Sequence, residues 1–529
     1  MLKAVLRSTI ILSLAALVSR VVGFLRDILL SYHFGAISQG EINPLDAYYA
    51  AFRIPDFIYN VLVVSAGMAL LIPLFTDFKK KHADVYHSLV QTLLVVFSIG
   101  VLAISLLIFV FAPYLVPILT GGFSAPMQAM TVDLTRIMLL SPIFFTLSTV
   151  IGSYLCVERN FISYSISPIL YNVGIIIGIV FLLPSWGVYG VAMGVVIGAM
   201  FHALVQLPFG MRAISYKVSV RFDAFSAELS TLLKLAVPRV LATSVNQVAL
   251  LIDTVIGAML TSGSITLINL LQNVIFLPIG LIGLPISIAS FVVISEYVSL
   301  DEHIKVEAKI RELIAQVLYL VTPIMLFFVF NSTDLIYLVF GRGKFVDNIS
   351  NVMIAAVALQ IFCLSIIPQS LIPIITKAFF SYKETWVPFW ISLISVVVSA
   401  IFSYLFAIVL GLEVYGLAIS FAFVSILQCI LLYFFFHKRI QSINWNLLNS
   451  FIKKYVVLTA LLALCLWPFT YLHLEGSPLI QALIRMSVSG VAFVLSFCVI
   501  SNILGFKEWD DVKRSVRLRF APGRANKGE

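Results

Sequence analysis

Charged residues are scarce in this chain: they make up 11% of its 529 residues, whereas hydrophobic residues make up 61%. A soluble globular domain carries roughly 25% charged residues. No hydrophilic block long enough to form a separate soluble domain interrupts the apolar sequence. The composition therefore excludes a soluble multi-domain protein and predicts a polytopic membrane protein.

Clusters of cysteine and histidine are also missing. Each of the five cysteines stands alone in or at the end of an apolar segment, without a CxxC pair or metal-type spacing. Such cysteines are typical of small core residues. The seven histidines are scattered, and no catalytic motif surrounds any of them. A membrane glycosyltransferase or polymer ligase would need catalytic carboxylates or histidines in a sizeable loop, so the sequence indicates that the protein is not an enzyme.

Long apolar stretches dominate the sequence instead. A transmembrane helix needs about 20 mostly apolar residues. The predicted fold is an all-α polytopic membrane protein with 14 transmembrane helices, arranged as two six-helix lobes plus two C-terminal helices. The predicted spans are Ile10–Tyr32, Leu45–Phe75, Leu89–Leu115, Met127–Val157, Ile162–Leu183, Val188–Phe209, Leu229–Leu260, Ile265–Val298, Leu313–Phe340, Val352–Phe380, Trp386–Leu410, Tyr415–Phe436, Tyr455–Leu472 and Leu479–Leu504.

Lysine and arginine are distributed unevenly between the two sides that these spans define. If the N-terminus is cytoplasmic, 25 of the 34 basic residues fall in inner segments or the C-terminal tail, and only Arg342 and Lys344 fall in outer connections. Cytoplasmic loops carry an excess of basic residues, so the asymmetry predicts an even number of spans with both ends inside. The basic tail is interpreted as a topology signal that contacts anionic membrane lipids, not nucleic acid.

Proline and glycine interrupt two long spans at matching places. Interrupted segments at corresponding positions in two halves indicate a transporter's central site, although ordinary kinking is the alternative. We expect an N-lobe at residues 1–211, a C-lobe at 212–440, two further spans at 441–505 and a basic cytoplasmic tail at 506–529. The interrupting residues are Pro55, Gly67 and Pro73 in the second span, and Pro278, Gly280, Gly283 and Pro285 in the eighth.

Five charged residues lie within the first two spans: Arg20, Arg26 and Asp27, then Asp46 and Arg53. A charge at the centre of a bilayer costs about 3 kcal/mol on insertion scales, so such residues face protein or a water-filled cavity. Residues seven apart share a helix face, which pairs Arg20 with Asp27 and Asp46 with Arg53.

The arginines suggest an anionic cargo, because a guanidinium donates two parallel hydrogen bonds to phosphate. Gly23 lies on the same face as Arg20 and Asp27 and permits a close approach. The alternative is that the charges pair with one another and only fasten the helices together. That pairing is expected for Asp27 with Arg20 or Arg26, but two carboxylates do not easily neutralise three arginines.

Asp253 lies in the middle of the seventh span, with nothing basic within one turn of it. An isolated intramembrane carboxylate is a candidate Na⁺ or H⁺ site. Ser399 and Ser403 of the eleventh span, four residues apart, are candidates for further oxygen ligands. The alternative is a structural pair with Arg239 or with a polar neighbour such as Gln247.

Several motifs resemble those of the MurJ (MviN) family of the MOP (multidrug/oligosaccharidyl-lipid/polysaccharide) transporter superfamily. The resemblance covers nearly the whole chain, and the first motif is the most specific. The motifs are Ser19–Asp27 followed by His33–Gly35, Asp46–Pro55, Phe340–Phe345, and Lys377–Phe380 followed by Lys383–Thr385 and Pro388.

The resemblance implies a flippase that moves lipid II, the undecaprenyl-pyrophosphate-linked peptidoglycan precursor, across the bacterial inner membrane. It places Arg20, Arg26 and Asp46 at positions that the family uses in its cavity, and Arg53 at a position that is basic there. It also places Asp253 near a position where some members have a sodium ligand.

The chain departs from the family pattern in two places, where part of the expected cationic cluster is missing. Tyr59 and Asn60, followed by Val64 and Ser65, stand where the family usually has basic residues and then Glu-Gly. Gln272 and Asn273 stand where the family has an Asp-Arg pair. These departures bear on the identity of the lipid-linked cargo.

The leading hypothesis is therefore an alternating-access flippase for lipid II, with a role in cell wall biogenesis and cell shape. The alternatives are an exporter of another polyprenyl-pyrophosphate-linked oligosaccharide or an ion-coupled drug exporter. We expect no cofactor, with Na⁺ or H⁺ as possible coupling ions. Cell-wall synthesis enzymes are candidate partners.

Overall fold

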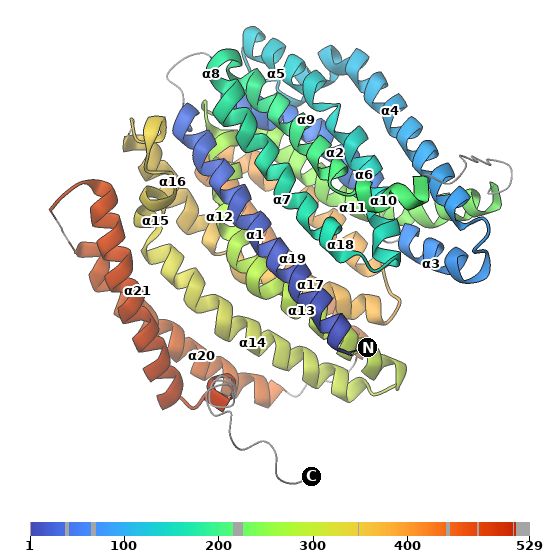
Figure 1. Cartoon of the computed structure of the whole chain (residues 1–529). Helices are drawn as coiled ribbons and strands as arrows, with labels where there is room; N and C mark the ends of the chain where they lie inside the picture. The colour runs from blue at the N-terminus through green and yellow to red at the C-terminus, as the bar shows by residue number, and fades with distance from the viewer. Residues whose placement is uncertain are drawn as a thin grey trace. The chain divides into compact units, whose positions relative to one another are not determined.

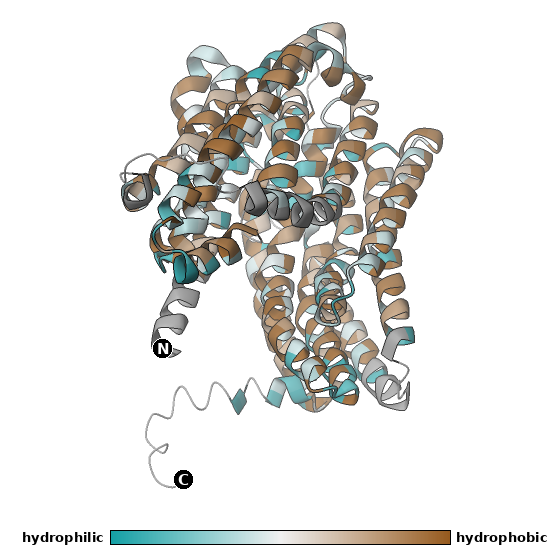
Figure 2. Ribbon diagram, turned by 90° about the vertical axis from the view of Figure 1, so that its right-hand side faces the viewer, coloured by the Kyte–Doolittle hydropathy of each residue, from teal (hydrophilic) through white to brown (hydrophobic). Residues whose placement is uncertain are grey.

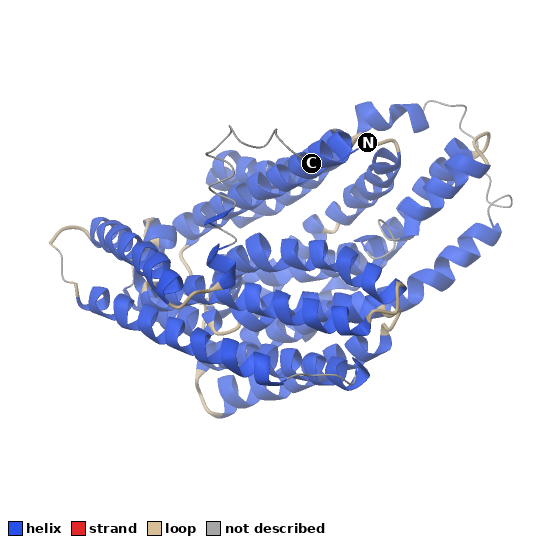
Figure 3. Ribbon diagram, turned by 90° about the horizontal axis from the view of Figure 1, so that it is seen from below, coloured by secondary structure: helices blue, strands red, loops and turns tan. Residues whose placement is uncertain are grey.

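The computed structural model describes residues 2–37, 42–64, 70–214, 226–347, 349–440, 445–472, 475–510 and 513–514. Every regular element in these residues is a helix, and none of them forms a strand (Figure 3). The prediction of an all-α fold is confirmed. The chain forms two compact units, the first comprising Met1–Leu270, Arg342–Asp347 and Ser403–Val414, and the second the remainder. The lobe boundaries at residues 211 and 440 stay a prediction.

Ten helices in the described residues are long and apolar enough to cross a membrane. They correspond to the third to fifth and the eighth to fourteenth predicted spans. The other four predicted spans fall on α1 (Leu2–Phe34), α2 (Pro44–Ile58), α9 (Val188–Leu204) and α11 (Ser226–Ala258). Helix α2 has 15 residues and α9 has 17, and the apolar part of α11 in the described residues, Ser244–Ala258, is also shorter than a full span. The count of fourteen stays a prediction.

The first unit is built around three helices that pack side by side. Helix α1 packs along α7 (Phe161–Ile177), and α7 packs against α9 (Figure 1). Its other elements are α3 (Ile72–Lys81), α4 (Tyr86–Leu119), α5 (Ala125–Met138), α6 (Ser141–Val157), α8 (Leu183–Trp186), α10 (Leu207–Ile214), the start of α12 (Ser264–Pro278), the 3₁₀-helix η6 (Gly343–Phe345) and three π-helices, η1 (Tyr59–Val64), η3 (Gly178–Leu182) and η7 (Leu405–Val409).

Glycine allows α7 and α9 to cross closely. A Cβ built on Gly174 would lie 2.3 Å from the Cα of Gly198, and one on Gly178 would lie 2.6 Å from the Cα of Gly194. Membrane helices associate through such small residues because lipid provides no hydrophobic drive between them. The crossing fixes α7, which carries the polar residue that contacts Arg26.

The second unit contains the rest of α12 and the helices that follow it. Helix α13 packs on α17, and α14 packs on α20, which in turn packs on α21. Arg485 of α21 forms a salt bridge with Asp334 of α15 at 2.6 Å. The elements are the π-helix η5 (Ile279–Gly283), α13 (Leu284–Ser299), α14 (His303–Phe330), α15 (Ser332–Phe340), α16 (Ile349–Cys363), α17 (Ile366–Ser381), α18 (Trp386–Tyr404), α19 (Glu413–Ile440), α20 (Trp445–Leu466), the 3₁₀-helix η8 (Trp467–Tyr471) and α21 (Pro478–Ile503).

Large apolar side chains cover the long helices on the outside. Phe181 is 70% exposed and Ile503 is 75% exposed. Hydrophobic residues run along the helices, while hydrophilic residues gather at helix ends and in connections (Figure 2). Exposed apolar patches of this extent suit a lipid solvent. The structure therefore supports a multi-pass membrane protein.

The predicted interruptions of the second and eighth spans are confirmed as π-helices. Helix η1 follows Pro55, and η5 follows Pro278 directly. Proline removes a backbone donor, and the lost bond favours local widening of the helix. Gly67 lies outside the described residues. Two further π-helices, η3 and η7, lie in the fifth and eleventh predicted spans and were not predicted from the sequence.

Candidate functional site

A small cavity lies beside Arg26 in the first unit, between α1, α2, η1, α6 and α7. Its volume is about 160 Å³, and its lining includes Arg26, Asp56, Tyr59, Phe145 and Tyr171. The hydroxyl of Tyr171 is buried without a hydrogen-bond partner among the described residues. Buried hydroxyls are normally satisfied. We refer to this cavity as the Arg26 pocket.

Arg26 is held in place by two neighbours. Its Nε and Nη2 donate to Oδ1 of Asp27 at 2.9 and 2.7 Å, and its Nη1 donates to Oδ1 of Asn172 at 3.1 Å. The Arg26 side chain keeps 20% of its surface exposed, while Asp27 keeps 3%. The predicted pairing of Asp27 with an arginine is confirmed. It neutralises both charges and fixes the orientation of the guanidinium.

Asn172 is a site residue that the sequence analysis missed. Its Nδ2 donates to the carbonyl of Pro168 at 3.1 Å and approaches the carbonyl of Ser19 at 3.4 Å. A Cβ built on Gly23 would lie 3.4 Å from Asn172 Oδ1. Gly23 therefore lies directly against the amide between α1 and α7, at a distance where a Cβ would make an ordinary van der Waals contact. The only sequence signal for Asn172 is an amide in an otherwise apolar span.

Arg53 has different partners from Arg26. Its Nε donates to Oγ1 of Thr254 and its Nη2 to Oδ1 of Asn269, both at 2.9 Å. Asp253 and Asp56 are close enough to interact with it electrostatically. Arg53 therefore ties α2 to α11 and α12. Among the described residues, Arg26 and Arg53 share none of these hydrogen-bond partners.

Arg20 lies six residues before Arg26 on α1 and is half-buried. Tyr59 and Asn60 stand where the family has basic residues after Pro55, and they contact α6 and α2. Tyr59 stacks on Phe145 with 4.4 Å between ring centroids, and Asn60 donates to Oδ1 of Asp56 at 2.8 Å. The wall of the pocket therefore carries the aromatic ring of Tyr59 where the resemblance implied positive charge.

Asp46 caps the start of α12. Its Oδ2 accepts from the backbone N–H of Gly263 at 2.6 Å, and its Oδ1 accepts from the N–H and the hydroxyl of Thr266 at 2.8 and 2.6 Å. Asp46 is only 2% exposed. A carboxylate at a helix N-terminus satisfies orphan N–H groups and complements the helix dipole. In this conformation Asp46 fastens α2 to α12, and its predicted contact with cargo stays a prediction.

Other close contacts surround this cap, and together we call them the α12 junction. Gly263 has a φ of +94°, and a Cβ there would lie 2.4 Å from the carbonyl oxygen of Ala36. A Cβ on Gly343, which has a φ of +57°, would lie about as close to the carbonyl oxygen of Tyr32. The end of α1, the start of α2, the α11–α12 turn and η6 therefore meet with almost no space between their backbones.

Asp253 is not isolated, because Arg53 lies within electrostatic reach of it. The side chain of Arg239, its predicted alternative partner, lies outside the described residues. Gln247 is half-buried on the same helix. The assignment of Asp253, Ser399 and Ser403 to an ion site stays a prediction. Within the described ranges no group of three or more His, Cys, Asp or Glu residues is placed to hold a metal ion.

The chain matches the family model for lipid II flippase MurJ over residues 34–486. It is 26% identical over 510 residues to the probable lipid II flippase MurJ of Buchnera aphidicola subsp. Schizaphis graminum, which covers 93% of this chain and 96% of that protein. It is also 26% identical over 515 residues to the lipid II flippase MurJ of Burkholderia cenocepacia, with 95% and 98% covered.

The fold is similar to those of solved transporters. A lipid II flippase MurJ in an inward closed conformation matches with a TM-score of 0.75 and 20% identity, over 94% of this chain and 100% of that one. An inward-facing MATE multidrug transporter of the MOP superfamily matches with a TM-score of 0.64 and 14% identity, over 80% and 94%. The predicted MOP-type fold is confirmed.

Proposed function

Because the chain belongs to the MurJ family of lipid II flippases, we propose that it moves lipid II across the bacterial inner membrane by alternating access. The observation that carries the proposal is a family match that extends over most of the chain. The Arg26 pocket supports it, since a positioned guanidinium within an apolar helix bundle suits a lipid-linked pyrophosphate. A transport role also fits the π-helices in matching spans.

Arg26 is the residue proposed to bind the pyrophosphate, with Arg20 beside it on α1. In this conformation Asp27 occupies two of the guanidinium's donors. A guanidinium has five N–H donors, so two of them stay available to a phosphate oxygen while Asp27 and Asn172 keep their hydrogen bonds to Arg26. Binding in this way leaves no buried charge unpaired. Tyr171 offers a further donor in the same cavity, because its buried hydroxyl lacks a partner among the described residues.

The α12 junction is proposed as the closed outer side of the transporter. This follows from the positive-inside orientation, which puts the end of the first span on the outer face. Alternating access then requires the Asp46 cap to release the start of α12. Arg53, Asp46 and Gly23 would act on the conformation of the protein, whereas Arg20 and Arg26 would contact the cargo.

Asp253 is proposed to link this change to an ion. A Na⁺ ion or a proton that neutralises Asp253 would free Arg53 from one of its two acidic neighbours. Because Arg53 also holds Thr254 and Asn269, such a change would reach α11 and α12 together. Anionic lipids at the basic tail and cell-wall synthesis enzymes remain proposed partners.

Complementation of a strain depleted of its lipid II flippase tests the proposal. We expect the wild-type chain to restore growth and Arg26→Ala to fail at equal membrane abundance. Arg26→Lys should restore growth only partly, because an ammonium cannot make the bidentate contact. Arg136→Ala is the matched control, since Arg136 lies 5.1 Å over the Phe109 ring and 4.0 Å from Asp133 at the surface.

Purified protein gives a second readout in proteoliposomes that contain lipid II. A wild-type chain that neither restores growth nor moves lipid II would overturn the lipid II assignment. Transport of a different polyprenyl-pyrophosphate-linked saccharide in the same vesicles would favour the first alternative. Normal transport by Arg26→Ala would contradict the role of Arg26 in binding the pyrophosphate. It would not contradict the flippase function.

A further inference from the structure

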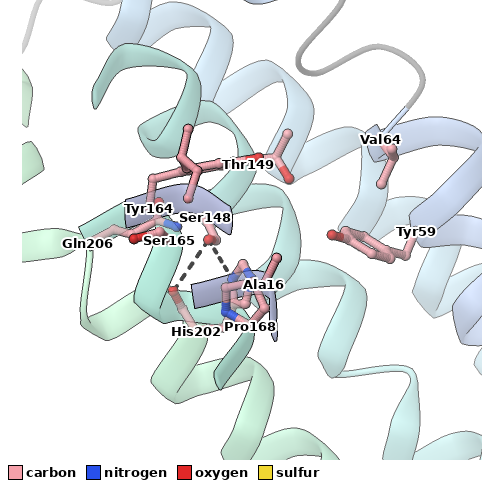
Figure 4. A pocket seen from close by; sticks show the side chains of 11 residues that line it. Ala16, Tyr59, Val64, Ser148, Thr149, Tyr164, Ser165, Pro168, His202 and Gln206 are labelled. Atoms are coloured by element: carbon pink, nitrogen blue, oxygen red, sulfur yellow. Dashed lines mark hydrogen bonds between the residues drawn. The ribbon is translucent and has the colours of Figure 1, made fainter. Parts of the chain in front are cut away.

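A second and larger cavity lies in the first unit and shares the lining residue Tyr59 with the Arg26 pocket. Its volume is about 270 Å³. Figure 4 shows the side chains that line it. Helices α1, η1, α6, α7 and α9 enclose it. Its polar lining comes from Tyr59, Ser148, Thr149, Tyr164, Ser165, His202 and Gln206.

No aspartate, glutamate, lysine or arginine lines this cavity. A site for a drug cation would need a carboxylate, and a site for a phosphate would need a base. Hydroxyl, amide and imidazole groups combined with aromatic and aliphatic surface suit an uncharged group that has both hydrogen-bonding edges and an apolar face. A sugar ring has this chemistry.

His202 is held in a fixed orientation within the cavity wall. Its Nδ1 shares a hydrogen bond with Ser148 Oγ at 2.7 Å, and its ring packs edge-on against Phe145 with 5.3 Å between centroids. Fixing one ring nitrogen determines which role the other nitrogen plays. The wall is therefore preorganised to offer an imidazole hydrogen bond.

Gln206 supplies the second feature. Its Nε2 donates to Ser167 Oγ at 2.8 Å, while its Oε1 is buried without a hydrogen-bond partner in the described structure. The residue is 0% exposed. A buried acceptor without a donor is costly. A hydroxyl or N-acetyl donor entering the cavity would relieve that cost after a small shift of the amide.

The size of the cavity limits its occupant. A single water needs only about 10–15 Å³ of such space, so the cavity is far larger than a water site. Pockets for drug-sized ligands run from about 300 to 1,000 Å³. A volume near 270 Å³ fits one ring-sized group rather than an extended saccharide.

The two cavities share a wall. Tyr59 lines both of them. Phe145, which stacks on Tyr59, lines the Arg26 pocket and also packs against His202. In a polyprenyl-pyrophosphate-linked saccharide, the first sugar is bonded directly to the pyrophosphate. A pyrophosphate at Arg26 would therefore present that sugar to the Tyr59–Phe145 pair and to the cavity behind it.

We propose that this second cavity, the sugar pocket, binds the uncharged sugar ring attached directly to the pyrophosphate of the cargo. The proposal rests on the proposed function, because it assumes a pyrophosphate-linked cargo at Arg26. It makes Gln206, and Ser148 acting through His202, residues that recognise the sugar rather than the phosphate.

The experiment compares two probes with purified full-length protein: lipid II, and undecaprenyl pyrophosphate, which lacks the sugars. We expect Gln206→Leu and Ser148→Ala each to weaken lipid II binding by about 5- to 10-fold, the effect of one lost hydrogen bond. Their affinity for undecaprenyl pyrophosphate should equal that of the wild type. Arg26→Ala should weaken the binding of both lipids.

Gln369→Leu is the matched control, because it removes a helix-to-helix bond of the same kind. Gln369 Nε2 donates to Ser425 Oγ at 2.9 Å in the other compact unit. Its affinity for both lipids should match the wild type.

Four outcomes would overturn the sugar pocket. Unchanged lipid II affinity in both pocket variants means that the cavity holds water only. Equal loss of affinity for the two lipids means that these residues support the fold or bind the lipid tail. Wild-type protein that binds both lipids equally well removes the sugar pocket while the proposed flippase function stands. Wild-type protein that binds neither lipid removes the proposed function as well.

Discussion

Asp46 shows how a carboxylate within a membrane-spanning bundle can be satisfied by two backbone N–H groups and one hydroxyl. Three donors from Gly263 and Thr266 surround its two oxygens, and no arginine is needed to balance it. Hydrogen bonds to an ionised group are about twice as strong as neutral ones. The same contacts also tie α2 to α12, so the charge that Asp46 carries stabilises one particular arrangement of these helices.

Replacing Asp46 with asparagine should loosen this arrangement. An amide keeps one acceptor oxygen but turns an NH₂ group toward the N–H donors of α12. We expect Asp46→Asn to lower the free energy of unfolding by about 1.5–3 kcal/mol, the range for bonds to charged groups. Reversible denaturation in mixed micelles measures the change.

Asp133→Asn is the control for this prediction. The Asp133 side chain is 56% exposed and lies 4.0 Å from Arg136. Exposed pairs of this kind contribute little to stability, so its unfolding free energy should match that of the wild type. Equal stability of the Asp46 and Asp133 variants would show that the cap does not hold the junction.

The residues of the site differ in how far the sequence could predict them. Asp27 follows Arg26 directly, so their pairing depends only on adjacent residues of one helix. The partners of Arg53 lie 201 and 216 residues away, and those of Asp46 lie 217 and 220 residues away. No pattern within one helix points to Thr254 or Thr266, because the contacts depend on how distant helices pack. The pairing of Arg26 with Asp27 was therefore predictable, and the cap was not.

Local widening of helices recurs at matching elements. Helices η1 and η5 lie in the second and eighth predicted spans, and η3 and η7 lie in the fifth and eleventh. Each pair is separated by six predicted spans, and the division into two six-helix lobes stays a prediction. Pro55 and Pro278 predicted the interruptions at η1 and η5 from the sequence. Helix η7 has no proline near it, so its position follows from packing and could not be read from local chemistry.

The crossing of α7 and α9 gives a prediction about helix packing. Gly174→Ala would place a Cβ 2.3 Å from the Cα of Gly198, where only backbone could move aside. Overpacking of this kind costs about 1–3 kcal/mol. We expect a lower melting temperature and less folded protein in the membrane. Because α7 carries Asn172, transport should fall as well.

Gly100→Ala is the matched control on α4, since a Cβ at that position meets nothing within 4 Å. Its melting temperature should not fall, because alanine is a better helix former than glycine. If Gly174→Ala is as stable as Gly100→Ala, the α7–α9 crossing tolerates separation, and the small residues there have no packing role.

At the scale of the whole molecule, composition alone predicted a helical membrane protein, and this is the most secure result of the sequence. Burial in lipid requires every backbone group to bond within its own helix, so long apolar segments have few alternatives. The number of spans is harder to fix, because α1, α2 and α11 carry charges that lower their hydropathy. In the fold, Asp27, Asp46 and Arg53 are held by hydrogen bonds to polar partners, and a hydropathy profile does not show such contacts.

Orientation in the membrane is the last property that the basic asymmetry predicts, and single cysteines can test it. In a variant without the five native cysteines, Lys344→Cys should react with a membrane-impermeant maleimide in intact cells. Lys80→Cys and Arg519→Cys should react only after permeabilisation, because inner segments hold the basic residues. Lys80 and Lys344 are both exposed, so burial does not decide the result, while Arg519 lies outside the described residues. Labelling of Arg519→Cys from outside would require an odd number of spans. Labelling of Lys80→Cys instead of Lys344→Cys would show that the orientation is the reverse of the predicted one. The α12 junction would then close the cytoplasmic side, where lipid II has to enter.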